Sequence, residues 1–217
     1  MVPPRRFLVL DTESSICQET NRRVLISLAY QVVDVHLGTL TEDTQELHYD
    51  IVQQPSGIHL DNASEQIHGI TLDRTQREGI PLCDALNRLL QVVKDSAPHA
   101  VVGHDIVGDI KLIVCEAIRA GMVPAQLSPL RNVLCTRQLS LGKCRLPLPH
   151  HLKYDYPCDM LLQKMNGIMP CNGINGYKWP SLEESYKLLA SHSANLTPCY
   201  GTHDAREPGT FFVRNGA

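Results

Sequence analysis

The sequence lacks several features that would assign it to a secreted, membrane or disulfide-rich class. Its 8 cysteines include no CxxC pair, so their spacing predicts neither a disulfide framework nor a tight zinc site. No hydrophobic run approaches the roughly 18–20 residues of a membrane span. The apolar stretch FLVL near the N-terminus is followed at once by acidic residues, so we expect no secretory signal. We therefore expect an intracellular protein of a reducing compartment, the cytoplasm or the nucleus, with no membrane partner.

The chain also lacks an excess of positive charge, with 20 lysines and arginines, 23 acidic residues and a formal net charge of −3. Such a chain is not a general binder of polyanions. An enzyme that acts on the end of one strand, however, needs only a local basic rim and metal ions. Nucleic acid therefore stays open as a partner.

The 217 residues, of which 43% are hydrophobic and 20% charged, suit a soluble globular protein with a sizeable core. The sequence shows no internal repeat and no clear domain boundary. We predict a single domain over residues 1–217, with an irregular loop insertion at about 141–180 that is rich in proline, glycine and histidine.

Strand-like and helix-like patterns follow one another in an order that predicts a mixed sheet. Three sequential strands, which would form an antiparallel meander, are expected at 7–11, 24–35 and 44–54. A polar loop is expected between the first two, at residues 14–23. Further along, a short buried strand at 99–105 lies between two stretches with helical spacing, 81–96 and 106–122. The predicted fold class is therefore α/β, with helices packed against a mixed sheet.

Two further helices carry capping signals. The stretch NASEQIHGI has Asn62 or Ser64 in place to cap a short helix that ends at Gly69. The stretch PSLEESYKLLAS has Ser181 as its cap and Glu184 three residues later, which is the pattern of a capping box. These signals predict where the two helices begin.

The stretch RFLVLDTESS, at residues 6–15, places two carboxylates at the end of a buried strand. Side chains alternate along a strand, so Asp11 and Glu13 would point to the same side. Like charges at this spacing repel each other, and neither ionises easily beside a low-dielectric core unless a cation is present. Two interpretations are open: the strand ends at Asp11 and both acids are solvated, or the pair binds cations.

Two other polar residues could join this pair. Asp109 lies in the first turn of the helix predicted in VVGHDIVGDIKLI, on the border of its buried stripe, and could reach the sheet edge near Asp11. Alternatively, Asp109 only complements the positive end of the helix dipole. His203 follows a glycine turn in YGTHDARE, where a lone histidine is more often a structural residue than a base.

Taken together, these stretches resemble the motifs of the DEDDh 3′–5′ exonucleases, which have the ribonuclease H-like fold. FLVLDTESS is similar to the first motif of that family, VVGHDIVGD to the second and GTHDARE to the third. Asp105 stands where the family usually has asparagine. Supporting matches occur in order along the chain: IHGIT, LCTRQLSL and YKWPSLEESY. The resemblance spans essentially the whole chain and implies a ribonuclease H-like mixed sheet, an antiparallel meander plus parallel strands, flanked by helices.

The resemblance also implies a two-metal mechanism on single-stranded DNA or RNA. Two divalent ions, Mg²⁺ or Mn²⁺, would clamp the scissile phosphate while water attacks it, which releases nucleoside 5′-monophosphates from the 3′ end. By resemblance the metal ligands include three carboxylates: Asp11, Glu13 and Asp109. Glu13 would hold the ion that carries the attacking water, and His203 would be the general base on that water. Thr12 and His68 match positions that contact the terminal nucleotide.

The third motif departs from the family pattern at its fourth carboxylate. The acid expected five residues after His203 is replaced by Pro208, which cannot bind a metal and also breaks the helix that carries the acid. Glu207, one residue earlier, could reach the same ion with its longer side chain. Two functions are therefore weighed: an active exonuclease that uses Glu207 as its fourth ligand, and a catalytically impaired nuclease-like module that binds nucleic acid.

Overall fold

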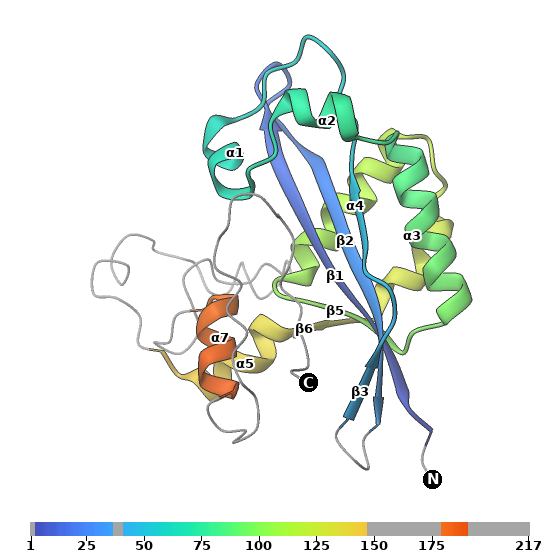
Figure 1. Cartoon of the computed structure of the whole chain (residues 1–217), viewed down its shortest axis with the longest axis vertical. Helices are drawn as coiled ribbons and strands as arrows, with labels where there is room; N and C mark the ends of the chain where they lie inside the picture. Colours follow the sequence, from blue (N-terminus) through green and yellow to red (C-terminus); the bar gives the residue numbers. More distant parts are fainter. Residues whose placement is uncertain (1–2, 37–40, 147–178, 191–217) are drawn as a thin grey trace, which may run out of the picture. The chain divides into compact units, whose positions relative to one another are not determined.

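The computed structural model of the chain describes residues 3–36, 41–146 and 179–190 (Figure 1). These residues belong to two compact units, divided between Cys135 and Thr136, and each unit is described by itself. Most of the predicted insertion at 141–180 lies outside the described residues. The single-domain organisation therefore stays a prediction.

The first unit is built on a mixed 6-stranded sheet in the order β3-β2-β1-β5-β6, with β4 also paired to β2. The strands are β1 (Arg5–Cys17), β2 (Arg22–His36), β3 (Thr41–Thr44), β4 (His48–Ile51), β5 (Ala100–Gly103) and β6 (Val133–Cys135). The first four pair in an antiparallel manner, and β5 and β6 continue the sheet parallel to β1. The predicted α/β fold class, an antiparallel meander plus parallel strands, is confirmed.

β1 is longer than the sequence predicts. Residues 14–17, expected in a polar loop, continue the strand and pair with the start of β2. Ser15 and Cys17 are buried in this segment and alternate with more exposed neighbours. The turn is limited to residues 18–21 and closes with Asn21 at φ 50°, a left-handed conformation that asparagine tolerates. The loop prediction is wrong because the pairing partner, and not local serine propensity, decides the end of the strand.

A β-bulge interrupts the hairpin beside Glu13. Glu13 is opposite Ser27, whereas Ser14 is opposite Leu25, so Ile26 is an extra residue in β2. Leu25 packs in the main hydrophobic cluster and Ile26 in a second, smaller one. The bulge therefore lets two successive residues of β2, Leu25 and Ile26, pack in different clusters beside Glu13.

The strand predicted at 44–54 is shorter in the structure, where β4 covers His48–Ile51 and Thr44 already belongs to β3. β3 and β4 pair with different parts of β2. The side-chain amide of Gln31 donates to the carbonyl oxygen of Gln45 at 2.7 Å, which satisfies the backbone where the ladder is broken.

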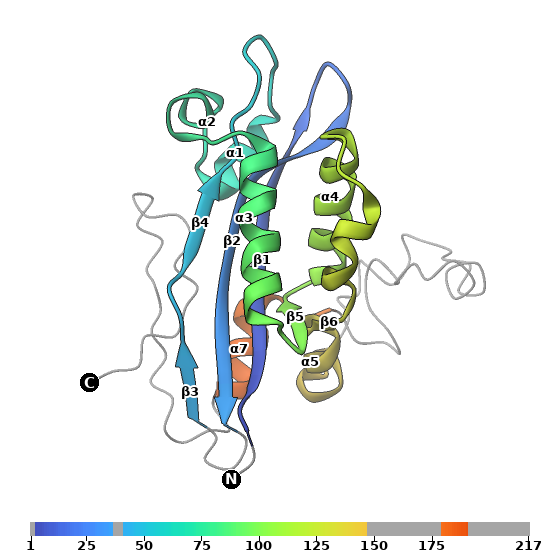
Figure 2. The same cartoon turned by 90° about the vertical axis from the view of Figure 1, so that its right-hand side faces the viewer.

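Helices cover both faces of this sheet, with α3 and α4 on one face and α1 over the other (Figures 1 and 2). The helices of this unit are α1 (Asn62–His68), α2 (Leu72–Glu78), α3 (Leu82–Ser96), α4 (Ile106–Arg119) and the 3-10 helix η1 (Pro124–Arg131). The sequence predicts α1, α3 and α4. It does not predict α2 and η1, because a short helix and a proline-containing turn carry little periodic signal.

The cap of α1 differs from the prediction. The N-cap is Asp61, whose carboxylate accepts hydrogen bonds from the backbone N–H groups of Ala63 and Ser64. The prediction of Asn62 or Ser64 as the cap is therefore wrong by one residue or more. The helix ends as predicted at Gly69, which has φ 69°.

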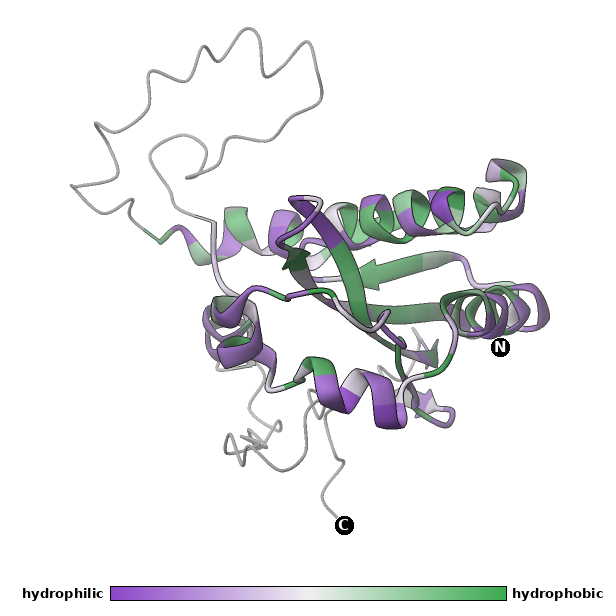
Figure 3. Ribbon diagram, turned by 90° about the horizontal axis from the view of Figure 1, so that it is seen from above, coloured by the Kyte–Doolittle hydropathy of each residue, from purple (hydrophilic) through white to green (hydrophobic). Residues whose placement is uncertain are grey.

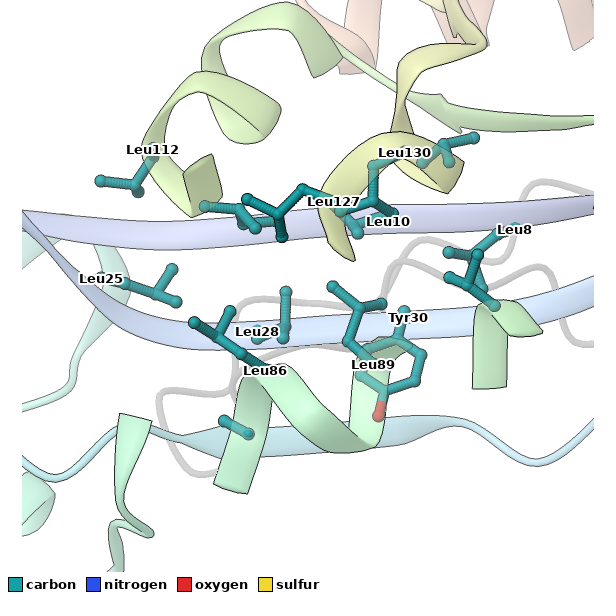
Figure 4. Packing of buried hydrophobic residues seen from close by; sticks show 14 of the residues in the cluster. Leu8, Leu10, Leu25, Leu28, Tyr30, Leu86, Leu89, Leu112, Leu127 and Leu130 are labelled. Atoms are coloured by element: carbon teal, nitrogen blue, oxygen red, sulfur yellow. The ribbon is translucent and has the colours of Figure 1, made fainter. Parts of the chain in front are cut away.

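The main hydrophobic core lies between the strands and the helices α3 and α4 (Figure 4). Leu8 and Leu10 of β1 have exposed fractions of 0% and 1%. Leu10 lies beside Leu127 of η1, while the fully buried Leu86 and Leu89 of α3 lie beside residues of β2. A second cluster comprises Ile26, Ile51, Leu60 and Ile70. Figure 3 shows that the central strands carry mainly hydrophobic residues. This core sets the position of the polar ends of β1 and β5.

The second unit contains α5 (Thr136–Cys144) and α7 (Leu182–Ala190). The two helices contact each other through a hydrogen bond between the hydroxyls of Ser140 and Ser185, 2.9 Å apart. The predicted capping box of α7 is present, because Ser181 N–H donates to Glu184 and the Glu184 N–H donates to the Ser181 hydroxyl. Helix α5 shows that the predicted irregular insertion does not begin before residue 145.

No helix in the described ranges combines the length and hydrophobicity required to cross a membrane. The cysteines that the structure describes are free thiols: Cys17, Cys83, Cys115, Cys135 and Cys144.

Candidate active site

β1 places Asp11 and Glu13 on one face of the sheet. Leu8 and Leu10 are buried in the main core, and Thr12 is the next residue on that same face. Asp11 and Glu13 alternate with these residues and point to the opposite face, as the sequence predicts. The strand does not end at Asp11, contrary to the prediction, so backbone pairing with β2 supports both carboxylates.

Helix α4 brings Asp109 to the same end of the strands. β5 runs parallel to β1 with Val102 opposite Val9, so His104 comes level with Asp11. α4 begins soon after and carries Asp109 in its first turn. The carboxyl ends of two neighbouring strands and the start of a helix therefore meet at one edge.

The connection from β5 into α4 is tight. A Cβ atom on Gly103 would lie 2.6 Å from the carbonyl oxygen of Leu10, so the close approach of these strands requires glycine. Asp105 is the N-cap of α4 and has φ 70°, a conformation that aspartate and asparagine adopt more readily than other side chains. Aspartate therefore suits the backbone at this position, as the asparagine usual in the resembled motif also would.

A short hydrogen bond joins the first and second motifs. The Thr12 hydroxyl donates to Oδ1 of Asp109 at 2.5 Å, although the two residues are 97 positions apart in the chain. Asp109 thus approaches β1 from the face covered by α3 and α4, whereas Asp11 and Glu13 leave the strand on the other face. The predicted contact of Thr12 with a terminal nucleotide stays a prediction.

The three carboxylates form one electrostatic cluster. Burial, together with the charges of Asp11 and Asp109, raises the pKa of Glu13 to about 7. Burial raises the pKa of Asp109 to about 7, against the hydrogen bond from Thr12, and the charges of Asp11 and Asp105 contribute to the increase. Glu13 and Asp109 therefore each lie close enough to another carboxylate to disfavour their ionised forms. Asp11 is exposed, whereas Glu13 and Asp109 are half-buried.

Opposing influences act on Asp11. Burial by the packed residues around the carboxylate raises its pKa, whereas a hydrogen bond from the backbone of Thr12 and the charge of His104 lower it. His104 is a site residue that the sequence analysis does not single out. In the sequence His104 is marked by its position directly after β5. This position indicates a place in the site after β5 is known to pair with β1.

The donor set suits a divalent cation. Carboxylate oxygens are the ligands that Mg²⁺ and Mn²⁺ prefer, and a positive ion would offset the repulsion that raises the pKa of Glu13 and Asp109. In the part of the chain that the structure describes, no three acidic, histidine or cysteine side chains are gathered closely enough to hold a metal ion. The described carboxylates therefore do not by themselves make a metal site.

His68 ends α1 and has one ring nitrogen without a partner. The residue has an exposed fraction of 8%, and its Nδ1 accepts the backbone N–H of Ile70 at 3.1 Å. The proton of the neutral ring is therefore on Nε2, which is buried and has no hydrogen-bond partner among the described residues. Burial lowers the pKa of His68, which favours this neutral form. Buried N–H donors in proteins are nearly always hydrogen-bonded to an acceptor, so we expect one for Nε2 of His68.

The third motif lies outside the described residues. This applies to the predicted base, His203, to the predicted fourth ligand, Glu207, and to Pro208. Their roles stay predictions.

No family model matches the chain, and no curated protein matches it in sequence. Comparison of folds finds solved structures of exonuclease I. A product-bound exonuclease I superposes with a TM-score of 0.55 at 13% identity, over 87% of this chain and 42% of that chain. E. coli exonuclease I in complex with a 5cy-dA13 oligonucleotide gives a TM-score of 0.54 at 14% identity, over 86% and 39% of the two chains.

The zinc-ion-bound form of the E. coli exonuclease I complex with single-stranded DNA gives a similar result. Its TM-score is 0.54 at 14% identity, over 87% of this chain and 39% of that chain. The protein described here therefore spans about two fifths of the length of these structures. It shares their fold.

Proposed function

We propose that the protein is a metal-dependent 3′–5′ exonuclease of the DEDDh type, which releases nucleoside 5′-monophosphates from the 3′ end of single-stranded DNA or RNA. One observation carries the proposal: the fold brings Asp109 of α4 against the first motif, where it accepts the Thr12 hydroxyl at 2.5 Å and its charge, with that of Asp11, raises the pKa of Glu13. Such coupled, desolvated acids are typical of functional sites.

The fold supports the same conclusion. E. coli exonuclease I, whose fold this chain shares, has been solved with single-stranded DNA and with a zinc ion. The carboxylates of this chain follow the order that the resemblance to the DEDDh motifs implies. Because the likeness covers about two fifths of that protein at low identity, the substrate class and the metal rest on the motifs.

The proposed mechanism divides the work among these side chains. The cations would be held by three described carboxylates and one outside the described residues: Asp11, Glu13, Asp109 and Glu207. Bound Mg²⁺ or Mn²⁺ supplies positive charge to the phosphate under attack and lowers the pKa of the attacking water. His203 would accept the proton of that water. His68 would donate from Nε2 to an oxygen of the terminal nucleotide.

A nuclease-like module that binds single strands without cleaving them is the second candidate. Pro208 favours it, because the family places a metal-binding carboxylate at that position. The arrangement of the described residues is in accord with it, since no set of three ligands closes around an ion there. Such a module would keep the donor on His68 and the fold of β1.

Release of mononucleotides from a 3′-labelled single strand in Mn²⁺ distinguishes the two candidates. We expect release by the parent protein and none by Asp11→Ala. Glu207→Ala should raise the Mn²⁺ concentration needed for half-maximal activity about tenfold, as the loss of one ligand weakens a site. Glu46→Ala, an exposed acid of the first unit, serves as the matched control. Strand binding by the parent with no release at any metal concentration would establish the binding module instead.

His68→Asn tests the substrate contact. Asparagine can still accept the Ile70 N–H but has no donor at the position of Nε2. We expect the KM for the strand to increase about tenfold with little change in thermal stability, because one hydrogen bond to a charged phosphate contributes about 1.5 kcal/mol. An unchanged KM, measured in the same release assay, would contradict the assignment of His68.

A further inference from the structure

We infer that Thr12 is a positioning residue of the candidate active site, whose hydroxyl holds the Asp109 carboxylate in place. The inference rests on the proposed function, because it concerns how one of the proposed metal ligands is oriented. It assigns Thr12 a role different from the nucleotide contact that the family resemblance implies.

The first step is the geometry of β1. Asp11 and Glu13 leave the strand on one face, so the residue between them must point to the other face. That face is covered by α4, and the Thr12 hydroxyl lies 2.5 Å from Oδ1 of Asp109. The alternation of the strand therefore directs Thr12, and neither Asp11 nor Glu13, at α4.

The second step is the hydrogen-bonding capacity of threonine. A hydroxyl has one proton to donate, and Thr12 donates it to Asp109. While this bond is made, the hydroxyl cannot also donate to a nucleotide oxygen. The bond occupies one of the acceptor positions of Oδ1 of Asp109.

The third step is the position of Thr12 between the two carboxylates of β1. Asp11 and Glu13 are its neighbours in the strand, and its own side chain bonds to Asp109. The Asp109 side chain has two rotatable bonds, and a partly buried bond of this length restricts both. A single residue thus ties the carboxylate from α4 to the carboxylates of β1, which a shared cation requires.

The test compares Thr12→Val, which removes the hydroxyl at nearly constant shape, with Thr12→Ser, which keeps it. Thr75→Val is the matched control, because Thr75 is a buried threonine whose hydroxyl donates to a backbone carbonyl, that of Leu72. Three quantities are measured for each variant: the Kd for Mn²⁺, by titration of the protein without nucleic acid, and the kcat and KM for a 3′-labelled single strand.

We expect Thr12→Val to weaken Mn²⁺ binding about tenfold and to lower kcat while KM for the strand is unchanged, in line with the effect of residues that orient metal ligands. Thr12→Ser should restore both, and Thr75→Val should alter neither. An increase in KM with an unchanged Kd for Mn²⁺ would instead show that Thr12 contacts the nucleotide and would overturn the inference.

The outcomes also separate this inference from the proposed function. If the parent does not cleave but binds Mn²⁺, and Thr12→Val weakens that binding, the positioning role stands and the exonuclease activity fails. If the parent cleaves and Thr12→Val binds Mn²⁺ as tightly as the parent does, the positioning role fails and the activity stands. Absence of Mn²⁺ binding by the parent overturns both.

Discussion

Asp109→Asn is expected to act in opposite directions on catalysis and on the stability of the metal-free protein. Hydrolysis should fall by about 10³-fold, because a metal ligand contributes several kcal/mol to stabilisation of the transition state. The free energy of unfolding without metal should increase, because asparagine carries no charge to desolvate. It can also still accept the hydrogen bond of Thr12.

The raised pKa of Asp109 determines how the free energy of unfolding changes with pH. Asp109 has a pKa of about 7 in the folded protein, against 3.8 in the unfolded chain. The folded state therefore holds its proton where the unfolded state has lost it, and the free energy of unfolding falls as the pH rises from about 4 to about 7. We expect the variant to exceed the parent by about 2 kcal/mol at about pH 8 and to match it near pH 4.

Thermal unfolding in the presence of a chelator measures this difference, which corresponds to about 5 °C for a chain of this size. Adding Mn²⁺ should raise the melting temperature of the parent more than that of the variant. Asp84→Asn is the matched control, since Asp84 occupies the first turn of α3 but is exposed. Its removal should leave hydrolysis unchanged. A melting temperature for Asp109→Asn below that of the parent at about pH 8 would contradict the coupled cluster.

Gly79→Ala is expected to cause the largest loss of stability in the first unit. A Cβ atom on Gly79 would lie 2.1 Å from the carbonyl oxygen of Thr75 and 2.7 Å from the Cα atom of Gln53. Both neighbours are backbone atoms, and Gln53 is itself tied to Ile80 by a backbone hydrogen bond of 2.8 Å. To accommodate the Cβ atom of alanine, α2 must therefore move away from Gln53, which follows β4.

We expect a decrease in the free energy of unfolding of about 3 kcal/mol, at the upper end of the cost of overpacking. Thermal unfolding would show this as a melting temperature lower by about 8 °C. Gly108→Ala is the contrasting variant, since the nearest atom to its Cβ is 4.0 Å away, and Gly108 lies within α4. It should stabilise the protein by about 0.5–1 kcal/mol. Equal melting temperatures for the two variants would refute the steric argument.

Local patterns account for much of the fold. The helical spacing of residues 81–96 and 106–122 predicts α3 and α4, because a helix buries every third or fourth residue wherever it packs. The capping box at Ser181 predicts the start of α7, since its hydrogen bonds form within four residues. α2 is not predicted because it packs through a close contact between Gly79 and Gln53, and the spacing of residues in the sequence does not indicate such a contact.

In the candidate site, too, local sequence patterns predict some features and tertiary packing decides the others. Alternation along β1 is a local property, so the sequence by itself determined that Asp11 and Glu13 share a face and that Asp109 opens a helix. Only the tertiary structure decided that β1 continues to Cys17 and that the Thr12 hydroxyl meets Asp109 from 97 residues away. The raised pKa values of Glu13 and Asp109 were likewise decided there, because burial and repulsion between distant charges exist only after the chain has folded.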